Sequence, residues 1–596
     1  MANSTKRTWI ILAIALCLIL VGDLLACMTQ TDWGKIKVRD VRFVGSNGVI
    51  RSALLYVPQG VTNKKPAPGI VAIHGYINAR ETQDGFAIEF ARRGYVVLAL
   101  DETGHGYSDP PAFAGGFGGI GMAEYLRSLD IVDPDNVGLE GHSMGGWASV
   151  LCAALDKDGY KAMVLAGSST GTYGAPDGTA TFPRNLGLVY SEWDEFSQLM
   201  WLTAIPRDIV KGDKLKTLFN TKDDVVVGQL YGSIADGTAR KLYMPRCTHP
   251  WDHMSTEAIG DAVEWFQATL EGGNGLPPAD QIWYWKEIGN LIALIGMVLL
   301  LFPVGKLLLS LNFFQGLVEA PAEPKPAKGI GWWICAAILV ILPVLTYFPF
   351  TELPIKLGWD PVSAALPFFP EGITTQIMIW AVLNGLIALV LFVIWHFVFN
   401  RKTGANGSNY GLSWGTALDW AKIGKSFLLA VAIAFIAYST LAFTDWLFKV
   451  DYRFWVFAVK PMSSLHFLIF LCYLIPFAFF FTVLATVVSG QLRPLAKDKE
   501  MRLGYEMLVN VALLVLGFIG LLVAMYAPLM AGGTLLIPEQ PLFAIIAFQF
   551  LPLMTIAACA FTYFFRNTGH IYTGAFLATL LVVWIVVASQ AIHFAF

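Results

Sequence analysis

The hydrophobic positions divide the chain into two parts. Between residues 36 and 280, short apolar runs alternate with stretches of mixed polarity, whereas residues 288–596 consist of long apolar runs separated by short loops. The first pattern is typical of a water-soluble domain and the second of membrane-spanning helices. A further apolar run at residues 9–26 follows Lys6 and Arg7, which predicts a membrane helix ahead of the soluble part.

Within the soluble part, apolar strands without polar alternation are separated by helices. Helical spacing predicts helices near 80–93 and 119–130. The strands are expected at 41–44, 50–57, 69–73, 95–100, 136–140 and 162–166. Strands of this kind are covered on both faces, so the pattern predicts an α/β fold with a doubly wound, mostly parallel sheet over residues 36–271.

The C-terminal half predicts an all-α polytopic membrane domain of eight helices over residues 288–596. A short linker, 272–287, rich in Gly and Pro, joins it to the soluble domain. The eight runs lie near 288–309, 329–348, 374–399, 426–448, 464–489, 503–528, 541–565 and 571–594. With residues 1–35 as an N-terminal signal anchor, nine spans are expected. Residues 24–27 loosely resemble a lipidation signal ending at Cys27, but Asp23 departs from that signal, which favours an uncleaved anchor.

The distribution of basic residues predicts the orientation of these spans. If the N-terminus is cytoplasmic, fourteen Lys and Arg residues lie on the cytoplasmic side: Lys6, Arg7, Lys306, Lys325, Lys328, Arg401, Lys402, Lys422, Lys425, Arg493, Lys497, Lys499, Arg502 and Arg566. The short loops on the other side hold four: Lys356, Lys449, Arg453 and Lys460. By the positive-inside rule we expect an integral plasma-membrane protein whose soluble domain is extracytoplasmic.

Polar side chains within the apolar runs are candidates for function because burying them in lipid is costly. Pairing across helices is the competing explanation. These residues are His396, Asp445, Glu506, Asn510 and Gln549.

Composition and charge narrow the classes of function. A hydrophobic content of 55% with 14% charged residues agrees with a chain partly in lipid, and a net charge of -3 provides no basic field for nucleic acid. Cys152 and Cys247 are the cysteines of the soluble part, and neither a disulfide framework nor a metal-binding spacing is present. We therefore expect no nucleic acid, cofactor or metal as a partner.

Ser143 is the strongest candidate for catalysis. It lies in a G-x-S-x-G pattern, Gly141 to Gly145, directly after the predicted strand 136–140 and before a helix of small residues. The two glycines permit a tight strand-to-helix turn that presents the hydroxyl above the sheet. The N-terminus of the following helix then points backbone N–H groups at a developing oxyanion.

Three segments of the soluble part resemble the α/β-hydrolase family, especially its serine-aminopeptidase-like and dienelactone-hydrolase-like esterase branches. They are residues 74–76, 101–108 and 132–146, and the resemblance covers about residues 40–270. It implies that the N–H groups of Tyr76 and Met144 form the oxyanion hole. It also implies that His74, His105 and His142 have structural roles.

The family order of nucleophile, acid and base implies where the other two catalytic residues lie. Residues 215–219 are interpreted as the next strand, and the turn after it matches the family's acid turn with Asp223 as the carboxylate. Asp224 remains an alternative, because the turn departs from the family pattern at two positions. His249 follows the strand near 240–244 and is the expected base, with His253 as the alternative.

Residues 167–214 are too long for one crossover helix and are interpreted as a lid. Their aromatic and apolar side chains either form an acyl pocket or pack the lid onto the core.

Together these patterns predict a membrane-anchored serine hydrolase that cleaves carboxylic esters, with small-molecule or lipid esters as substrates. A peptidase or amidase would use the same triad. A transporter or sensor whose hydrolase-like domain only binds a ligand is the alternative from another class, and full biological activity of Ser143→Ala would favour it. Neither the oligomeric state nor the role of the membrane domain is predicted.

Overall fold

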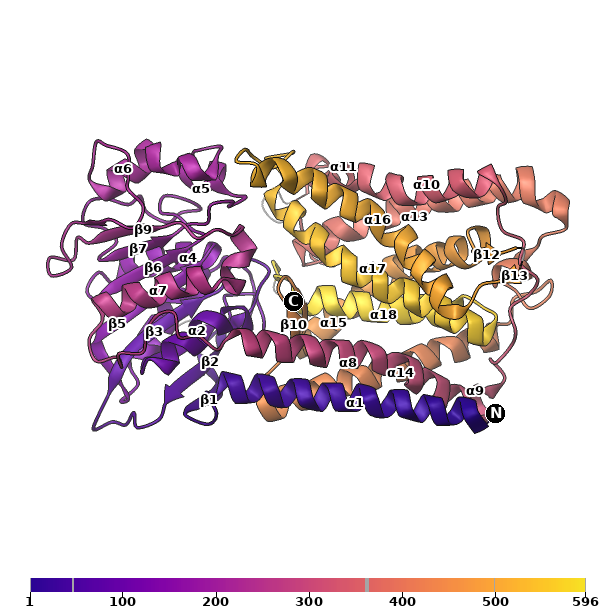
Figure 1. Cartoon of the computed structure of the whole chain (residues 1–596), viewed down its shortest axis with the longest axis horizontal. Helices are drawn as coiled ribbons and strands as arrows, with labels where there is room; N and C mark the ends of the chain where they lie inside the picture. The colour runs from indigo at the N-terminus through magenta and orange to yellow at the C-terminus, as the bar shows by residue number, and fades with distance from the viewer. Residues whose placement is uncertain (1, 46–47, 360–363, 498, 595–596) are drawn as a thin grey trace.

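The computed structural model describes residues 2–45, 48–359, 364–497 and 499–594 of the 596-residue chain. Figure 1 shows an α/β part at one end of an elongated molecule and a bundle of long helices that fills the rest. Helix α1 (Ala2–Gln30) precedes the soluble part in the chain and helix α8 (Tyr284–Leu309) follows it, and these two helices connect the soluble part to the bundle.

The soluble part is built on a mostly parallel nine-stranded sheet of order β1-β2-β4-β3-β5-β6-β7-β9-β8. The neighbouring strands β4, β3, β5, β6, β7 and β9 run parallel to one another. Strands β1 and β2 pair antiparallel at one edge, and β8 pairs antiparallel with β9 at the other. The strands are β1 (Ile36–Val44), β2 (Ile50–Pro58), β3 (Ala67–Ile73), β4 (Val96–Leu100), β5 (Val132–His142), β6 (Ala162–Ala166), β7 (Leu186–Val189), β8 (Leu230–Tyr231) and β9 (Arg240–Tyr243). The predicted doubly wound sheet is confirmed.

Helices cover both faces of this sheet. Side chains alternate along a strand, so Ile70 and Ala72 pack under α2 (Asp84–Arg92) and α7 (Thr256–Thr269). Val71 and Ile73 pack on the opposite face against α3 (Gly119–Arg127) and α4 (Met144–Leu155). The expected helices near 80–93 and 119–130 correspond to α2 and α3.

Two predictions for the soluble part are wrong. Residues 215–219 are not a strand but belong to helix α6 (Asp213–Phe219), whose buried Leu215, Leu218 and Phe219 follow helical spacing. The segment 167–214 is not only a lid, because it contributes strand β7 to the middle of the sheet. It also holds the short helix α5 (Ser197–Trp201), whose Trp201 is fully buried in the core.

Long apolar helices form the remainder of the chain. Among the described residues, seven helices have the length and apolar composition to cross a membrane, and Ile330–Leu345 and Tyr572–Ala588 are shorter apolar helices. The longer helices after α8 are α10 (Ile330–Leu345), α13 (Gly372–Trp395), α14 (Trp420–Phe448), α15 (Ser464–Thr486), α16 (Leu503–Met530), α17 (Pro541–Thr568) and α18 (Tyr572–Ala588), and the short helices are α9 (Asn312–Gln315), α11 (Tyr347–Thr351) and α12 (Leu353–Lys356). Each predicted run corresponds to a helix, whereas the count of nine spans and their orientation stay predictions.

Several polar side chains of the bundle pair across helices. The Asn510 amide donates to Thr562 at 2.8 Å, and Arg566 pairs with Glu506 at 2.7 Å. Gln549 donates to the carbonyl of Val456 at 2.9 Å. These contacts satisfy groups that would otherwise face lipid.

Helices α1 and α8 pack closely through small residues. A side chain added at Gly289 would lie 2.7 Å from the backbone nitrogen of Ala26, and one added at Gly22 would lie 2.5 Å from that of Ala293. Such contacts let two helix backbones approach. Arg92 of α2 pairs with residues on both connections, with Asp280 at 2.9 Å and with Asp32 at 3.8 Å.

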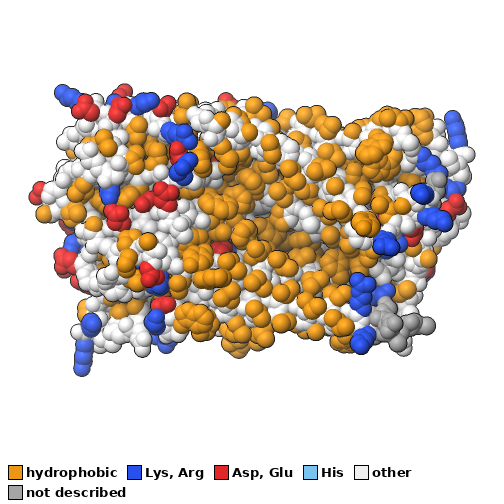
Figure 2. All heavy atoms as spheres, in the orientation of Figure 1, with side chains coloured by type: hydrophobic (Ala, Val, Ile, Leu, Met, Phe, Trp, Pro, Cys, Tyr) orange, Lys and Arg blue, Asp and Glu red, His pale blue; other side chains and the backbone are white. Residues whose placement is uncertain are grey.

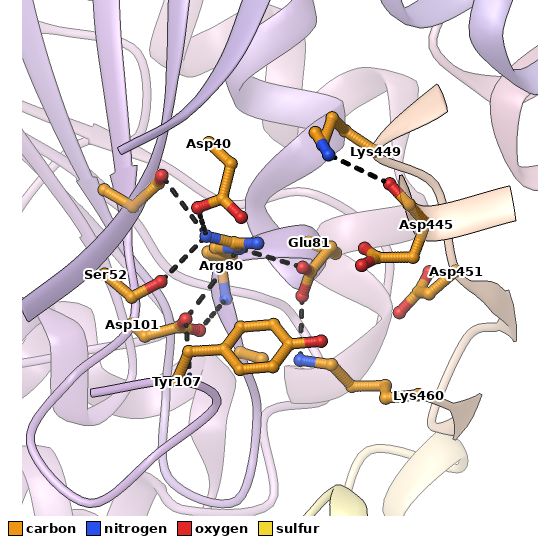
Figure 3. Close-up of polar contacts among 12 residues, drawn as sticks. Asp40, Ser52, Arg80, Glu81, Asp101, Tyr107, Asp445, Lys449, Asp451 and Lys460 are labelled. Carbon is orange, nitrogen blue, oxygen red and sulfur yellow. Dashed lines mark hydrogen bonds and ion pairs between the residues drawn. The ribbon is translucent and has the colours of Figure 1, made fainter. Parts of the chain in front are cut away.

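A buried ionic network joins the soluble part to the membrane bundle (Figure 3). Arg80 pairs with Asp40 at 2.8 Å and with Glu81 at 3.0 Å, and Lys460 donates to Glu81 at 2.8 Å. Lys460 follows the small hairpin of β10 (Tyr452–Phe454) and β11 (Phe457–Val459), which lies between α14 and α15. Charges buried at this depth are tolerated because they are paired, so the network fixes how the two parts dock.

Candidate functional site

Ser143 stands at the junction between β5 and α4 in a strained backbone conformation. Its φ of 56° and ψ of -119° lie outside the regions that non-glycine residues favour, and its N–H donates to the Ala166 carbonyl at 2.9 Å. The flanking glycines make this turn possible: a side chain at Gly141 would overlap the backbone of Gly145, and one at Gly145 would overlap the carbonyl of Ile73. Strain of this kind is characteristic of a nucleophile elbow.

His249 follows β9 and pairs with a buried carboxylate. Its Nδ1 lies 2.8 Å from Oδ2 of Asp194, and both side chains are almost completely buried. Burial is the largest single effect and lowers the pKa of His249, but the nearby carboxylates of Asp194, Glu195 and Asp252 together raise it above its ordinary value. A carboxylate at Nδ1 leaves Nε2 as the nitrogen available to accept a proton.

The structure does not bring Asp223 or Asp224 to His249. Both side chains are exposed after α6, and Asp224 pairs instead with Lys216 at 2.8 Å. Asp194 occupies the place expected of the acid, because it follows β7, the strand between β6 and β9 in the sheet. The sequence interpretation assigned this strand to the lid and the helix α6 to the sheet, which is why it expected the acid after residue 219.

His253 lies beside His249 without a carboxylate partner. Among the described residues neither of its ring nitrogens has a hydrogen-bond partner, and its ring lies 4.1 Å from that of His142 between centroids. Burial, and then the neighbouring His142 and His249, hold the pKa of His253 well below its ordinary value. His253 is therefore an uncharged residue that lines the site, and it lacks the carboxylate partner that orients His249.

Tyr76 and Met144, whose N–H groups the resemblance implies as oxyanion donors, lie close to Ser143. Met144 is the first residue of α4, and a side chain added at Gly75 would meet Cβ of Ser143 at 2.9 Å, which shows how closely the 75–76 loop approaches the nucleophile. Both residues line the same cavity as Ser143. His74 stabilises the neighbouring turn, because its Nε2 accepts from the Glu102 N–H at 3.0 Å.

The cavity above Ser143 has a volume of about 380 Å³ and is shared between the two parts of the molecule. The soluble part contributes Tyr76, Ser143, His249 and His253, together with Phe196, Leu199 and Met200 of the predicted lid. The membrane part contributes Glu287, Arg453, Trp455, Leu542, Ile545 and Gln549. A substrate bound here contacts both parts, and the sequence alone offered no signal for the second wall.

A carboxylate next to the acid connects the site to α16. Glu195 accepts the backbone N–H of His249 at 2.8 Å, and its other oxygen accepts the hydroxyl of Tyr526 at 2.9 Å. Burial, with the charge of Asp194, raises the pKa of Glu195 to about 7. Tyr526 therefore ties the base-bearing loop to the bundle.

The described residues hold no group of three or more His, Cys, Asp or Glu side chains arranged to bind a metal ion. This arrangement brings a hydroxyl in a strained turn into one cavity with an imidazole that is oriented by a carboxylate, the combination that an activated serine nucleophile requires.

Comparisons with known proteins agree with this architecture. A family model described as serine aminopeptidase, S33, matches residues 64–194. No curated protein matches the chain.

Two solved structures that resemble this chain each cover about two fifths of it. An esterase from Pyrococcus furiosus shares 14% identity with a TM-score of 0.29, over 41% of this chain and 94% of that one. A dienelactone hydrolase from Anabaena variabilis shares 16% identity with a TM-score of 0.27, over 40% of this chain and 100% of that one. The strand order, the strained turn at Ser143 and the family match together show that the soluble part of this chain has the α/β-hydrolase fold, next to a helical region with apolar helices long enough to span a membrane.

Proposed function

We propose that this chain is a membrane-anchored serine hydrolase that cleaves carboxylic esters with Ser143 as nucleophile, His249 as base and Asp194 as the orienting acid. The observation that carries the proposal is that His249, which lines the same cavity as the strained Ser143, pairs with Asp194 at 2.8 Å. An unactivated serine is a poor nucleophile at neutral pH, and this pair is the activation that it needs.

The reaction proceeds in two balanced halves. Oγ of Ser143 attacks the ester carbonyl carbon while its proton passes to Nε2 of His249, and the oxyanion receives hydrogen bonds from the N–H groups of Tyr76 and Met144. Collapse breaks the bond to the alcohol, which leaves with the proton held by His249. Water then attacks the acyl-enzyme, gives a proton to His249 and releases the acid, and that proton returns to Ser143.

Labelling with a fluorophosphonate followed by peptide mapping tests the nucleophile. We expect one adduct, on Ser143, that is absent from Ser143→Ala. An adduct on another residue, or active protein without an adduct, contradicts the proposal. Peptides and amides use the same machinery, so a panel of acyl esters and aminopeptidase substrates of graded size decides between the two substrate classes.

We further propose that the hydrolase domain is extracytoplasmic. The basic residues support this orientation: Figure 2 shows Lys and Arg gathered at the end of the bundle opposite the soluble part, with an apolar band between. A membrane-impermeant maleimide added to intact cells should label Lys64→Cys in the soluble part and not Lys402→Cys at the far end, since both positions are exposed. The reverse labelling would invert the topology.

A further inference from the structure

The segment that follows α18 lies between the membrane bundle and the soluble part. Figure 1 shows that α18 runs through the bundle toward the soluble part. After this helix, the N–H of Ile592 donates to the carbonyl of Gly104 at 2.8 Å, and the N–H of Ala112 donates to the carbonyl of Ile592 at 2.7 Å. Ile592 is therefore bonded through its backbone to both ends of the soluble loop 104–112.

The bundle holds the same segment from the other side. The N–H of His593 donates to the carbonyl of Pro370 at 2.8 Å, and Ile592 forms an isolated β-bridge with Glu371, just before α13 begins. Ile592 is also buried. Because its backbone is bonded to both parts of the molecule, the segment presents the side chain of His593 in a defined place.

His593 contacts the side chain of Tyr76, one of the two proposed oxyanion donors. Its Nε2 lies 2.8 Å from the hydroxyl of Tyr76. Both rings also pack against Phe113, whose centroid lies 5.0 Å from that of His593 and 5.4 Å from that of Tyr76. The phenol of Tyr76 is thus anchored to the segment after α18.

The loop that carries Tyr76 is strained and depends on its surroundings. Ile77 has a φ of 57°, in the left-handed region that a β-branched residue rarely adopts. Its N–H donates to Nε2 of His105 at 3.2 Å, and His105 belongs to the loop 104–112 that pairs with the segment after α18. That segment therefore supports the Tyr76 loop twice, through His105 at the backbone and through His593 at the side chain.

The N–H of Tyr76 is available to a ligand. In the part of the chain that the structure describes, this N–H has no acceptor, and Tyr76 lines the catalytic cavity together with Ser143. A donor stabilises an oxyanion most when it is fixed in advance where the charge develops, because it then needs no reorientation during the reaction. Holding the phenol of Tyr76 restricts the peptide that bears this N–H.

We propose that His593 is a positioning residue of the active site, which holds the phenol of Tyr76 so that the Tyr76 N–H faces the oxyanion formed at Ser143. The inference rests on the proposed esterase function. His593 is not among the described residues that line the cavity, so it acts through Tyr76. The membrane part of the chain thereby takes part in catalysis, since it supplies a support of the oxyanion hole.

The test measures hydrolysis of p-nitrophenyl butyrate by full-length protein in detergent, with active sites counted by fluorophosphonate labelling. His593→Phe keeps a ring against Phe113 and removes the hydrogen bond to Tyr76. Loss of one oxyanion donor costs about 100- to 1,000-fold in kcat, and here the donor is displaced rather than removed, so we expect kcat per labelled site to fall about 10- to 100-fold. KM should stay within about threefold of wild type.

A second His–Tyr pair provides the matched control. Nδ1 of His396 lies 2.7 Å from the hydroxyl of Tyr410, at the other end of α13, whose 24 residues span about 36 Å. His396→Phe removes a hydrogen bond of the same kind far from Ser143. It should keep kcat per labelled site within about twofold of wild type.

A double-mutant cycle identifies the group through which His593 acts. Tyr76→Phe breaks the same hydrogen bond from the other side and leaves the N–H of Tyr76 in place. If the two groups act through one contact, the double variant loses no more activity than the less active of the two single variants. Losses that multiply would assign His593 another role and overturn the proposal.

Inhibition by a trifluoromethyl ketone gives a readout that a purely structural role would not move. Oγ of Ser143 adds to the ketone carbon, its proton passes to His249, and the carbonyl oxygen becomes an oxyanion that the oxyanion hole stabilises. The inhibition constant of His593→Phe should rise by the factor by which its kcat/KM falls.

The outcomes separate this inference from the function on which it rests. If wild-type protein hydrolyses no ester and carries no adduct on Ser143, the proposed function fails, and the inference fails with it. If wild-type protein is active and His593→Phe keeps the wild-type kcat and inhibition constant, the proposed function stands and the role of His593 is wrong. Fewer labelled sites with an unchanged kcat per site would make His593 a folding contact and overturn the proposal as well.

Discussion

The substitution Asp194→Asn removes the charge that faces His249 and keeps the size of the side chain. Asp194 is completely buried and lies 2.8 Å from Nδ1 of His249, so little solvent screens the lost interaction. The same substitution at Asp223 provides the matched control, because that carboxylate is exposed and has no contact with His249.

The size of the effect follows from the charge pair. At about 4 Å between charge centres and an effective dielectric constant of about 20, the carboxylate stabilises the imidazolium formed during catalysis by about 4 kcal/mol. This energy corresponds to about a thousandfold in rate. An amide at Asp194 also donates to Nδ1, which favours the tautomer that cannot accept the Ser143 proton. We therefore expect Asp194→Asn to lower kcat by about 1,000- to 10,000-fold.

The assay is steady-state hydrolysis of p-nitrophenyl butyrate by full-length protein in detergent, with equal elution on size exclusion as the check of folding. Asp223→Asn should stay within about twofold of wild type. A loss of kcat below tenfold in Asp194→Asn would refute the assignment of Asp194 as the acid. A loss of kcat above a hundredfold in Asp223→Asn would refute it as well and would return the acid to the turn after α6.

Three further outcomes follow from the geometry. In the proposed mechanism His249 acts as a neutral base. Burial lowers its pKa, but Asp194, with Glu195 and Asp252, raises it above the ordinary value, so activity should be lost as pH falls through this raised pKa, and this acid limb should move to lower pH in Asp194→Asn. Gly145→Val places a side chain against a backbone carbonyl and should abolish fluorophosphonate labelling, whereas Gly121→Val on the open face of α3 should be labelled normally. Gly289→Leu forces α1 away from α8 and should lower the thermal unfolding midpoint in detergent, measured by intrinsic fluorescence, by roughly several degrees.

The parts of the site that the sequence predicted are those determined by local patterns. Ser143 was recognisable because the strand, the two glycines and the following helix are contiguous in the chain. The membrane helices were recognisable for the same reason, since the apolar length needed to cross a bilayer is a local property.

The pairing of Asp194 with His249 depended on the order of strands and was not predicted. Strand β7 has four residues, too few for a periodic signal, and includes Gly187, where any side chain would collide with the ring of Trp265 on α7. Conversely, Leu215, Leu218 and Phe219 have helical spacing, yet the short apolar run around them was interpreted as a strand. The second wall of the catalytic cavity depends on how two parts of the chain dock, which no local pattern encodes.

The close contact between α1 and α8 restricts how the hydrolase domain can move. A domain attached through one helix can turn about that helix, but this domain is attached through two helices in backbone contact, and Arg92 pairs with residues on both connections. Two attachment helices resist twisting, and the ion pair of Glu81 with Lys460 and the hydrogen bond of Tyr526 to Glu195 hold the domain to the bundle at two further places. Glu287 of α8 lines the cavity together with Ile545 of α17 and Trp455 of the β10–β11 hairpin, so this attachment helix is itself part of the wall of the proposed site, and a displacement of α8 would change the width of that site.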